Sequence, residues 1–416
     1  MGDDMATILF KRFSPVIIIF GCLFCVLVPE SSSQIILENT DEYEFIRELV
    51  DSQQYVSAIH HLTLKIEEDP LDSQALLMRG KVNAFMGNYS DAIDDYNSAA
   101  RTDPELAEAY LCTGILYNLV DKPKYAIVNL DRAIELEPRN AAAYFWRGDA
   151  YDELGKSVTA LEDYDRAIEL EPDSAECYMG RGCVYSKDGK FAYAIEDYNV
   201  AIRLDPENFL CWYNRGIAYY NLGKLDNAMR DFEGAVSLCA EFPQAVFYKG
   251  MTLYKKEEYT KAIEQFDATE EMVPNDPIVL IYRGNCFLGL QKPGRAIADY
   301  SMAIRIDPEF AEAYANRGRA FEEKGEVSMA LADYSKAIDL NGEDGWSCYN
   351  RGVLYYEMGA FKEALEDLKR AVALGYDVSE NLLEGCAREL EKDKGPGQTA
   401  SSDDDAARST RFSPDR

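Results

Sequence analysis

The side chains that most often perform catalysis or bind metals are few in this sequence, and their spacing suits neither task. The only two histidines, His60 and His61, are neighbours. Neighbours on a helix point about 100° apart, which does not suit one shared metal ion. The sequence contains no phosphate-binding glycine loop, no Gly-x-Ser-x-Gly motif and no His-Glu-x-x-His motif. We therefore predict that the protein is not an enzyme and binds neither a metal nor a cofactor.

Arginine and aspartate, in contrast, recur together at a fixed separation of 16 residues. Where Thr113 replaces the arginine, Asn129 replaces the aspartate, and Lys249 is likewise matched by Gln265. A half-buried guanidinium needs a carboxylate that accepts two hydrogen bonds. The pattern predicts a ladder of structural Arg–Asp pairs between two helices, with a ligand-facing row as the alternative. The pairs are Arg79 and Asp95, Arg147 and Asp163, Arg181 and Asp197, Arg215 and Asp231, Arg283 and Asp299, Arg317 and Asp333, and Arg351 and Asp367.

These pairs lie within a repeat of 34 residues. Glycine recurs at that interval without a slip, at Gly80, Gly114, Gly148, Gly182, Gly216, Gly250, Gly284, Gly318 and Gly352. If this glycine is position 8, a degenerate first unit carries Ile46 in its place, and alanine occupies position 20 of all ten units. A repeat of this length indicates stacked supersecondary units. The units are 39–72, 73–106, 107–140, 141–174, 175–208, 209–242, 243–276, 277–310, 311–344 and 345–378.

The apolar positions of each unit predict two helices. Positions 4, 7, 8 and 11 form one helical face, and positions 17, 20, 24 and 27 form another. Each stripe is too narrow for its helix to be stable alone, so the helices must pack on each other and on the next unit. Proline at position 32 stops the second helix in seven units. Glycine at position 15 can end the first helix in the left-handed conformation in six units: Gly87, Gly155, Gly189, Gly223, Gly325 and Gly359.

In this spacing, and in its glycine, alanine, aromatic and proline positions, the sequence resembles the tetratricopeptide repeat family over residues 39–378. The resemblance implies an all-α fold, a right-handed superhelical α-solenoid of tandem helix-turn-helix repeats whose first helices line a concave groove. It also implies a non-enzymatic scaffold that binds an extended peptide segment of a partner protein in that groove. The alternative is a structural component of an exported or envelope complex that uses its convex or end faces.

By the same resemblance, positions 2, 5, 6, 9, 12 and 13 of each first helix face the groove. At these positions, unit 141–174 has acidic residues beside a phenylalanine, units 209–276 have several aromatic residues, and units 277–378 have both polar and aromatic residues. The net charge of −31 argues against nucleic acid, because a negative surface repels phosphate. We therefore expect a basic or aromatic-bearing peptide. The candidate residues are Phe145, Asp149, Asp152, Tyr213, Asn214, Tyr220, Phe247, Tyr254, Asn285, Asn316, Arg319, Trp346, Tyr349, Asn350 and Tyr356.

Two ligand-binding sub-types of the family match this sequence poorly. The carboxylate clamp of the chaperone-binding type needs lysine and arginine where this chain has residues such as Ile281 and Trp346, and only Asn285 and Asn316 match. A free C-terminal carboxylate is therefore not the expected ligand. The asparagine ladder at position 6, as in the protein glycosyltransferase family, is limited here to Asn214, Asn316 and Asn350.

The two ends of the chain differ in composition from the repeats. Lys11 and Arg12 precede a 13-residue apolar run, 16–28, which is shorter than the ~20 residues of a spanning helix. This pattern favours a secretory signal over residues 1–33 and export of the protein, with an uncleaved membrane anchor as the alternative. We expect a linker at 34–38, a capping helix at 379–394 and a disordered tail at 395–416. Asn88-Tyr89-Ser90 is a glycosylation sequon that has meaning only in a eukaryotic secretory pathway.

Eight cysteines lie outside the apolar N-terminal run, mostly at helix-packing positions, where cysteine behaves as a small apolar residue. Cys177 and Cys211 occupy position 3 of adjacent units, which helix packing places about 10 Å apart, beyond the ~7 Å limit for a disulfide. We predict free thiols in the folded protein, which intact-mass measurement under non-reducing conditions will check.

Local consistency with the repeat is lowest over residues 239–276. Proline arrives late, at Pro243, and Glu257 replaces the turn glycine. Because a repeat array opens first where its neighbour interactions are weakest, we expect faster amide exchange here than in 141–208 or 311–344. The alternative is that Pro243 starts the next helix equally well.

Overall fold

The computed structural model describes residues 41–393, and the regular structure in this range is helical, without strands. The chain divides into two compact units, the first ending at Ala245 and the second beginning at Val246. The expected signal segment and linker, and the expected tail at 395–416, lie outside the described residues. Among the helices of the described range, none is long and apolar enough to cross a membrane.

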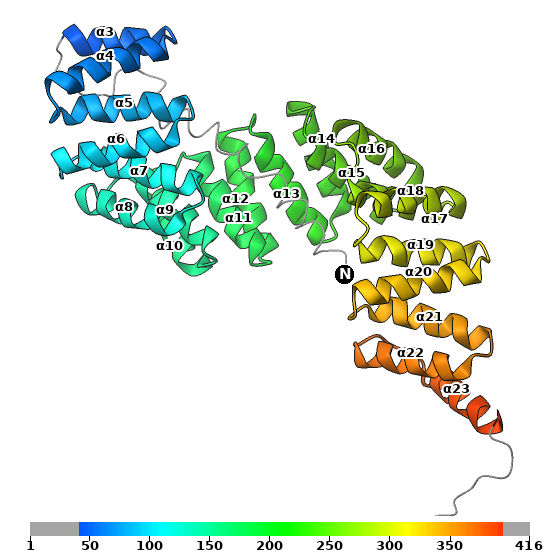
Figure 1. Cartoon of the computed structure of the whole chain (residues 1–416). Helices are drawn as coiled ribbons and strands as arrows, with labels where there is room; N and C mark the ends of the chain where they lie inside the picture. The colour runs from blue at the N-terminus through cyan, green and yellow to red at the C-terminus, as the bar shows by residue number, and fades with distance from the viewer. Residues whose placement is uncertain (1–40, 394–416) are drawn as a thin grey trace, which may run out of the picture. The chain divides into compact units, whose positions relative to one another are not determined.

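The first compact unit holds the helices α3 to α14 (Figure 1). Each first helix of a repeat carries an odd number, and the second helix that packs on it carries the following even number. The bounds are α3 Asp41–Asp51, α4 Tyr55–Glu68, α5 Ser73–Phe85, α6 Tyr89–Thr102, α7 Ala107–Leu119, α8 Pro123–Leu136, α9 Ala141–Glu153, α10 Ser157–Leu170, α11 Ala175–Lys187, α12 Phe191–Leu204, α13 Phe209–Asn221 and α14 Leu225–Leu238.

The second compact unit holds the helices α16 to α23, and the division between the two units lies inside α15 (Pro243–Lys255). The bounds are α16 Tyr259–Met272, α17 Pro277–Gly289, α18 Pro293–Ile306, α19 Ala311–Glu323, α20 Val327–Leu340, α21 Gly345–Glu357, α22 Phe361–Ala373 and α23 Glu380–Asp393. The expected all-α array of packed helix pairs is confirmed.

The turn inside each repeat uses the left-handed conformation at position 15. The six glycines expected there all have positive φ, for example Gly223 at 71°. The other four units hold the same conformation with a side chain present, at Gln53, Asp121, Glu257 and Gln291. A side chain costs roughly 1 kcal/mol or more in this region, so the packing of the helix pair imposes the turn even where the sequence opposes it.

The conserved spacing of glycine at position 8 and a ring at position 24 reflects close packing of the two helices. At Gly216, an added Cβ would lie 2.7 Å from Cε1 of the fully buried Phe232. The same overlap, 2.5 Å, would arise between Gly284 and Tyr300. At Gly216 and Gly284, a side chain larger than hydrogen would therefore require the facing ring or helix to shift.

The segment expected to be weak, 239–276, contains the division between the two compact units. Pro243 is the first residue of α15, as the alternative interpretation had it. Thr269, which replaces the usual alanine, is buried, and its hydroxyl donates to the Gln265 carbonyl at 2.8 Å. The amide-exchange prediction itself stays a prediction.

The cysteines of the described range are unpaired, and most are buried. Burial raises the pKa of the Cys112 thiol to about 12 and that of Cys286 to about 12. Because the thiolate is the reactive form, these thiols are chemically inert at neutral pH.

Candidate partner-binding surface

The first helices are held in place by the Arg–Asp ladder, which forms as predicted. In the repeat of α13 and α14, Nε and Nη2 of Arg215 each donate at 2.7 Å to the two oxygens of Asp231. The Asp231 side chain is 5% exposed, and that of Arg215 is 15% exposed. All seven expected pairs make this contact. The ladder is therefore structural, and its arginines are committed to the fold rather than to a ligand.

Each ladder Arg–Asp pair also has a third member, a second acceptor for the arginine, which was not predicted from the sequence. Nη1 of Arg215 donates at 2.7 Å to Asn199, which lies 16 residues earlier on the second helix of the preceding repeat. Nη1 of Arg147 and of Arg181 bind Asp131 and Asp165 in the same way. The arginine thus joins two repeats, with an acceptor 16 residues before it and another 16 residues after it. We refer to this three-residue contact as the arginine clamp.

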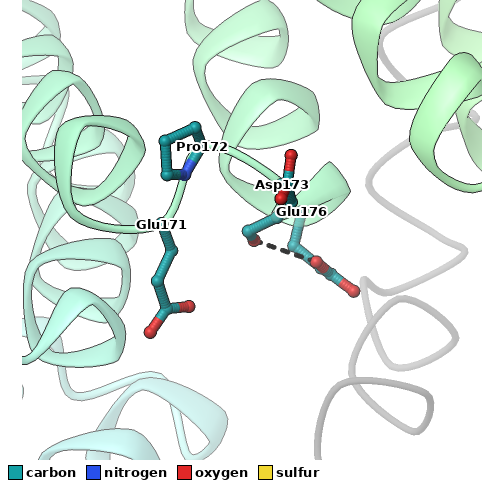
Figure 2. Close-up of a pocket in the computed structure, with 5 residues that line it drawn as sticks. Glu171, Pro172, Asp173 and Glu176 are labelled. Carbon is teal, nitrogen blue, oxygen red and sulfur yellow. Dashed lines mark hydrogen bonds between the residues drawn. The ribbon is translucent and has the colours of Figure 1, made fainter.

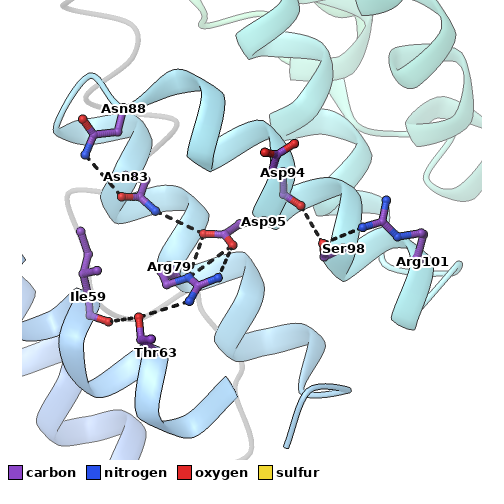
Figure 3. A network of polar contacts seen from close by, with 9 residues as sticks. All are labelled: Ile59, Thr63, Arg79, Asn83, Asn88, Asp94, Asp95, Ser98 and Arg101. Carbon is purple, nitrogen blue, oxygen red and sulfur yellow. Dashed lines mark hydrogen bonds and ion pairs between the residues drawn. The ribbon is translucent and has the colours of Figure 1, made fainter. Parts of the chain in front are cut away.

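Figure 3 shows the clamp nearest the N-terminus. Arg79 binds Asp95 through Nε and Nη2 and reaches Thr63 with Nη1 at 3.2 Å. Asn83 donates to the same Asp95 carboxylate at 3.2 Å. The buried aspartate is thereby fully hydrogen-bonded, which removes most of the cost of burying its charge.

The acidic spot expected in the repeat 141–174 lies on the last turns of α9. Asp152 forms an ion pair with Lys187, which comes from the equivalent end of α11. The Asp149 side chain makes no hydrogen bond within the described residues, and Glu153 is exposed. Three neighbouring carboxylates thus share one ammonium group, which leaves an excess of negative charge on this face of α9. We call Asp149, Asp152 and Glu153 the α9 carboxylates.

The pKa of Asp149 reflects this excess. Burial first, and then the neighbouring charges of Glu153 and Asp152, raise it to about 7, whereas Lys187 opposes the shift. The pKa of Glu153 is also raised, first by burial and then by the charge of Asp121. A carboxylate with such a pKa is destabilised as an anion. A further cation beside it would relieve that cost.

Three of the expected groove aromatics are buried, which corrects their assignment as ligand contacts. Tyr213 is 3% exposed, Tyr220 is 5% exposed and Phe247 is 2% exposed. Tyr213 packs edge-on against Phe242, with ring centroids 4.8 Å apart. These rings fill the space between consecutive repeats. Position 5 therefore serves packing wherever a large ring occupies it in these repeats.

The other candidates in the first compact unit are partly engaged. The Phe145 ring is half-buried and contacts Trp146 and Tyr164 at centroid distances of 5.2 and 5.7 Å. The Asn214 amide points its Nδ2 toward Sγ of Cys183 at 3.7 Å. Among the first-unit candidates, Asp149 and Asp152 are therefore the ones best placed to meet a ligand.

In the second compact unit, the candidate asparagines mostly bond within the protein. Asn285 accepts from the Tyr300 hydroxyl at 2.6 Å, and Asn350 donates to the Trp346 carbonyl at 2.8 Å. Nδ2 of Asn316 is buried and has no hydrogen-bond partner in the described range. A ladder of free asparagine amides is therefore not present here.

The remaining second-unit candidates form two small groups. Arg319 is 55% exposed and pairs with Glu323 at 3.2 Å, whereas the half-buried Tyr254 lies between the Tyr259 and Tyr282 rings. Trp346 packs edge-on against Tyr334, with centroids 5.9 Å apart.

The two candidate tyrosines of α21, Tyr349 and Tyr356, lie in the last repeat of the array. The Tyr349 ring packs at a tilt of 37° against the Tyr376 ring, with centroids 4.9 Å apart. The hydroxyl of Tyr356 would lie 3.0 Å from a Cβ placed on Gly385 of α23. Tyr356 is thus a contact of the terminal helix, and its assignment to a ligand surface stays a prediction.

Two charged residues of the first helices, Lys187 and Glu312, were not identified from the sequence. Lys187 is at position 13 of its repeat and Asp152 at position 12 of the one before, so reading these positions across adjacent repeats would have paired them. Glu312, at position 2 of its repeat, has a pKa raised to about 7, first by burial. Burial that depends on neighbouring side chains is not visible in the sequence.

The turns that join consecutive repeats form a separate acidic surface. Figure 2 shows a shallow depression lined by Glu171, Pro172, Asp173, Ser174 and Glu176. Ser174 donates to Glu176 at 3.0 Å and caps the start of α11 by accepting from the Cys177 amide. These polar groups are satisfied locally or by solvent, so the depression is a capped turn rather than a shaped site.

Comparison with known families agrees with the repeat architecture. Models described as TPR repeat and Tetratricopeptide repeat match residues 124–155, 141–174, 182–223, 209–242, 247–309, 294–325, 311–344 and 345–374. Together these matches cover more than half of the chain. None of the curated proteins matches it in sequence.

Several solved structures are similar in fold. A tetratricopeptide repeat protein from Parabacteroides merdae is 20% identical, with a TM-score of 0.48 over 59% of this chain and 98% of its own. The APC/C hetero-tetramer Cut9-Hcn1 is 14% identical, with a TM-score of 0.48 over 83% of each chain. YrrB, described as a TPR protein with an unusual peptide-binding site, is 21% identical, with a TM-score of 0.38 over 45% of this chain and 97% of its own.

Proposed function

The chain belongs to the tetratricopeptide repeat family, and from that premise we propose that it is a non-enzymatic scaffold that binds an extended, basic segment of a partner protein through the first-helix face of α9 and α11. The family supports an interaction scaffold in general. The α9 carboxylates support the choice of this face and of a cationic ligand.

The observation that carries the proposal is the unbalanced charge of the α9 carboxylates. Asp152 has the single ammonium group of Lys187, and Asp149 has no hydrogen-bond partner within the described residues. An arginine guanidinium presents several donors in a plane and can bridge two carboxylates, which a lysine ammonium does less well. The preferred ligand is therefore a segment that contains arginine.

The exposure of Lys187 indicates how such a ligand would bind. The Lys187 side chain is 63% exposed, whereas that of Asp152 is 11% exposed. Because Lys187 is the exposed partner of this pair, we expect an incoming cation to compete with its ammonium group for Asp152. An incoming guanidinium would replace Lys187 at Asp152 and add a contact to Asp149.

Fluorescence anisotropy with a labelled peptide of alternating arginine and tyrosine tests this proposal. A matched peptide with glutamate in place of arginine is the ligand control. Asp149→Asn and Asp152→Asn should each weaken binding of the basic peptide about tenfold, because a hydrogen bond to a charged group contributes roughly 1.5–3 kcal/mol. Lys187→Met should strengthen binding, because the competing cation is lost.

A double variant, Glu171→Gln with Asp173→Asn, provides the matched protein control. It removes two negative charges from the exposed turn of Figure 2 without touching the α9 carboxylates. The control should bind the basic peptide like the parent protein. Equal weakening in the control and in the α9 variants would show that the peptide responds to net charge alone, and the proposed face would be wrong.

We propose further that the scaffold works after export, on the strength of the charged and apolar pattern of residues 1–33. Expression of the full chain in a eukaryotic host, followed by N-terminal sequencing of the secreted protein, tests this. A mature N-terminus near Gln34 supports it, and retention of Met1 in a cytosolic fraction contradicts it.

A further inference from the structure

We propose that Asn88, in the exposed turn between α5 and α6, is the acceptor of an N-linked oligosaccharide. This inference goes beyond the proposed binding function and rests on export of the chain. Asn88 lies in a glycosylation motif. Its side-chain amide is accessible to solvent, and the fold does not depend on it.

The sequence supplies a complete acceptor motif at this turn. Asn88 is followed by Tyr89, which is not proline, and by the hydroxyl of Ser90. Every other asparagine in the 416 residues lacks serine or threonine two positions later. A chain that enters the secretory lumen therefore offers one site for this modification.

The turn presents the motif to solvent. Gly87 has φ 79° and reverses the chain at the end of α5. Asn88 and Ser90 are both exposed. A Cβ added at Gly87 would meet no atom within 4 Å, so the space beside the acceptor is open. A bulky, hydrated glycan fits such a surface turn without displacing protein groups.

The acceptor side chain differs from other asparagines at helix starts. Asn140 and Asn208 accept hydrogen bonds from the amides of Ala143 and Leu210, and each thereby caps a helix. Asn88 precedes α6 and makes no side-chain cap bond. Modification of Asn88 therefore removes no helix cap, which elsewhere would cost stability.

The one described contact of the Asn88 side chain survives modification. Its Nδ2 donates to Oδ1 of Asn83 at 3.5 Å, the outer limit of a hydrogen bond, as Figure 3 shows. A glycosylated amide retains one N–H, which can still donate to Asn83. The stronger bond from Asn83 to Asp95, 3.2 Å, is separate and keeps the arginine clamp intact.

The reaction would be a glycosyl transfer from a lipid diphosphate-linked oligosaccharide. The bond from Nδ2 of Asn88 to C1 of the first sugar forms, and the bond from that C1 to the diphosphate oxygen breaks. The amide loses one proton, and the lipid diphosphate leaves with the bonding electron pair. No oxidant or reductant is needed.

Expression of the full chain in a eukaryotic secretory host tests the inference. The secreted protein should lose mass on treatment with peptide N-glycosidase, and Asn88 should be converted to aspartate. Asn88→Gln and Ser90→Ala should each remove the mass shift, whereas Ser90→Thr should keep it. Both side chains are exposed, so these changes should leave folding unaffected.

A transplanted motif separates the acceptor from export. Lys190→Asn with Ala192→Ser, made in the Asn88→Gln background, creates the motif at the equivalent turn, where Gly189 has φ 72°. If the transplanted motif is glycosylated but Asn88 of the parent protein is not, the chain is exported and Asn88 is not an acceptor, which would overturn the inference. If neither motif is glycosylated, the chain does not reach the secretory lumen, and the inference fails because its premise of export is wrong. The peptide-binding assay is independent of either result, so failure here remains distinct from failure of the proposed function.

Discussion

Two junctions between repeats in the first compact unit join the same kind of helix pair by different chemistry. Between 175–208 and 209–242, Arg215 forms a clamp with Asp231 and Asn199. Between 73–106 and 107–140, Thr113 occupies the arginine position, and its hydroxyl bonds locally to the Ala109 carbonyl at 2.7 Å. The second junction thus has no arginine clamp: the polar contacts across it are the Lys81–Glu108 ion pair and a 3.4 Å bond from the exposed Arg132 to the Pro104 carbonyl.

What replaces the clamp at the second junction is a larger apolar core. Ile115 and Leu116 are both fully buried there. They belong to one continuous apolar cluster that extends from Leu76 to Ala150. At the clamped junction, the equivalent of Ile115 is the half-buried Ile217. Repeats can therefore be joined by a directed polar contact or by burial of apolar area, and this chain uses both.

The largest expected effect comes from breaking one clamp. Arg215→Leu should lower the free energy of unfolding by about 3–5 kcal/mol, because it leaves the buried Asp231 carboxylate without its partner. Chemical denaturation of the variant and the parent protein measures this change.

The double change Arg215→Leu with Asp231→Leu is the matched control, and it should recover much of that loss. Simple additivity of the two single changes would mean that the side chains are not coupled. The comparison between polar and apolar junctions would then lose its basis.

The next effect distinguishes the apolar junction. Ile115→Ala should cost about 2–4 kcal/mol, because it empties a fully buried site in the continuous core. Ile217→Ala, at the same position of the clamped junction, should cost about half as much or less, because that side chain is partly solvated. Equal losses of stability in the two variants, measured by thermal or denaturant unfolding, would contradict the claim that apolar burial matters more at the junction without a clamp.

A smaller effect isolates the link between repeats. Asn199→Ala removes the acceptor of Arg215 Nη1 but leaves the Asp231 contact in place. We expect a loss of about 1 kcal/mol, the usual net contribution of one hydrogen bond. Asn97→Ala, at the same repeat position before Thr113, should change stability by less than half of that. A larger loss at Asn97 would refute the assignment of the third partner.

The smallest effect concerns the turns of the same two repeats. Asp121 holds φ 57° where Gly223 holds φ 71°. Asp121→Gly should stabilise the protein by about 0.5 kcal/mol, and Gly223→Ala should destabilise it by about 1 kcal/mol. Thermal unfolding of both variants measures the difference. A loss of stability in Asp121→Gly would show that the left-handed conformation of Asp121 is not strained.

The fold and the ladder could be predicted because each depends on periodic residues. The 34-residue spacing predicts the helix pairs, and matched substitution at Thr113 and Asn129 predicts the Arg–Asp pairing. The third clamp partner was missed because its residue type varies among aspartate, asparagine, serine and threonine. Because this position needs only an oxygen that accepts a hydrogen bond, several residue types can fill it, and no one residue recurs there in the sequence.

The candidate surface was predicted less well, for a physical reason. Tyr213 and Phe247 lie at repeat positions that can face either a ligand or the neighbouring repeat. Their burial depends on the volumes of the side chains around them, such as Phe242 and Phe266, and not on helical position. The assignment of Asp149 and Asp152 to a ligand surface stays a prediction, because nothing in the sequence showed that both carboxylates would be partly buried.

The pH dependence of basic-peptide binding tests the central claim most directly. Asp149 titrates near pH 7 in the folded protein. Its anion therefore forms as the pH rises through that value, so affinity should increase several-fold from pH 6 to pH 8. In Asp149→Asn the increase should disappear. An equal pH response in the parent protein and in Asp149→Asn would contradict the account.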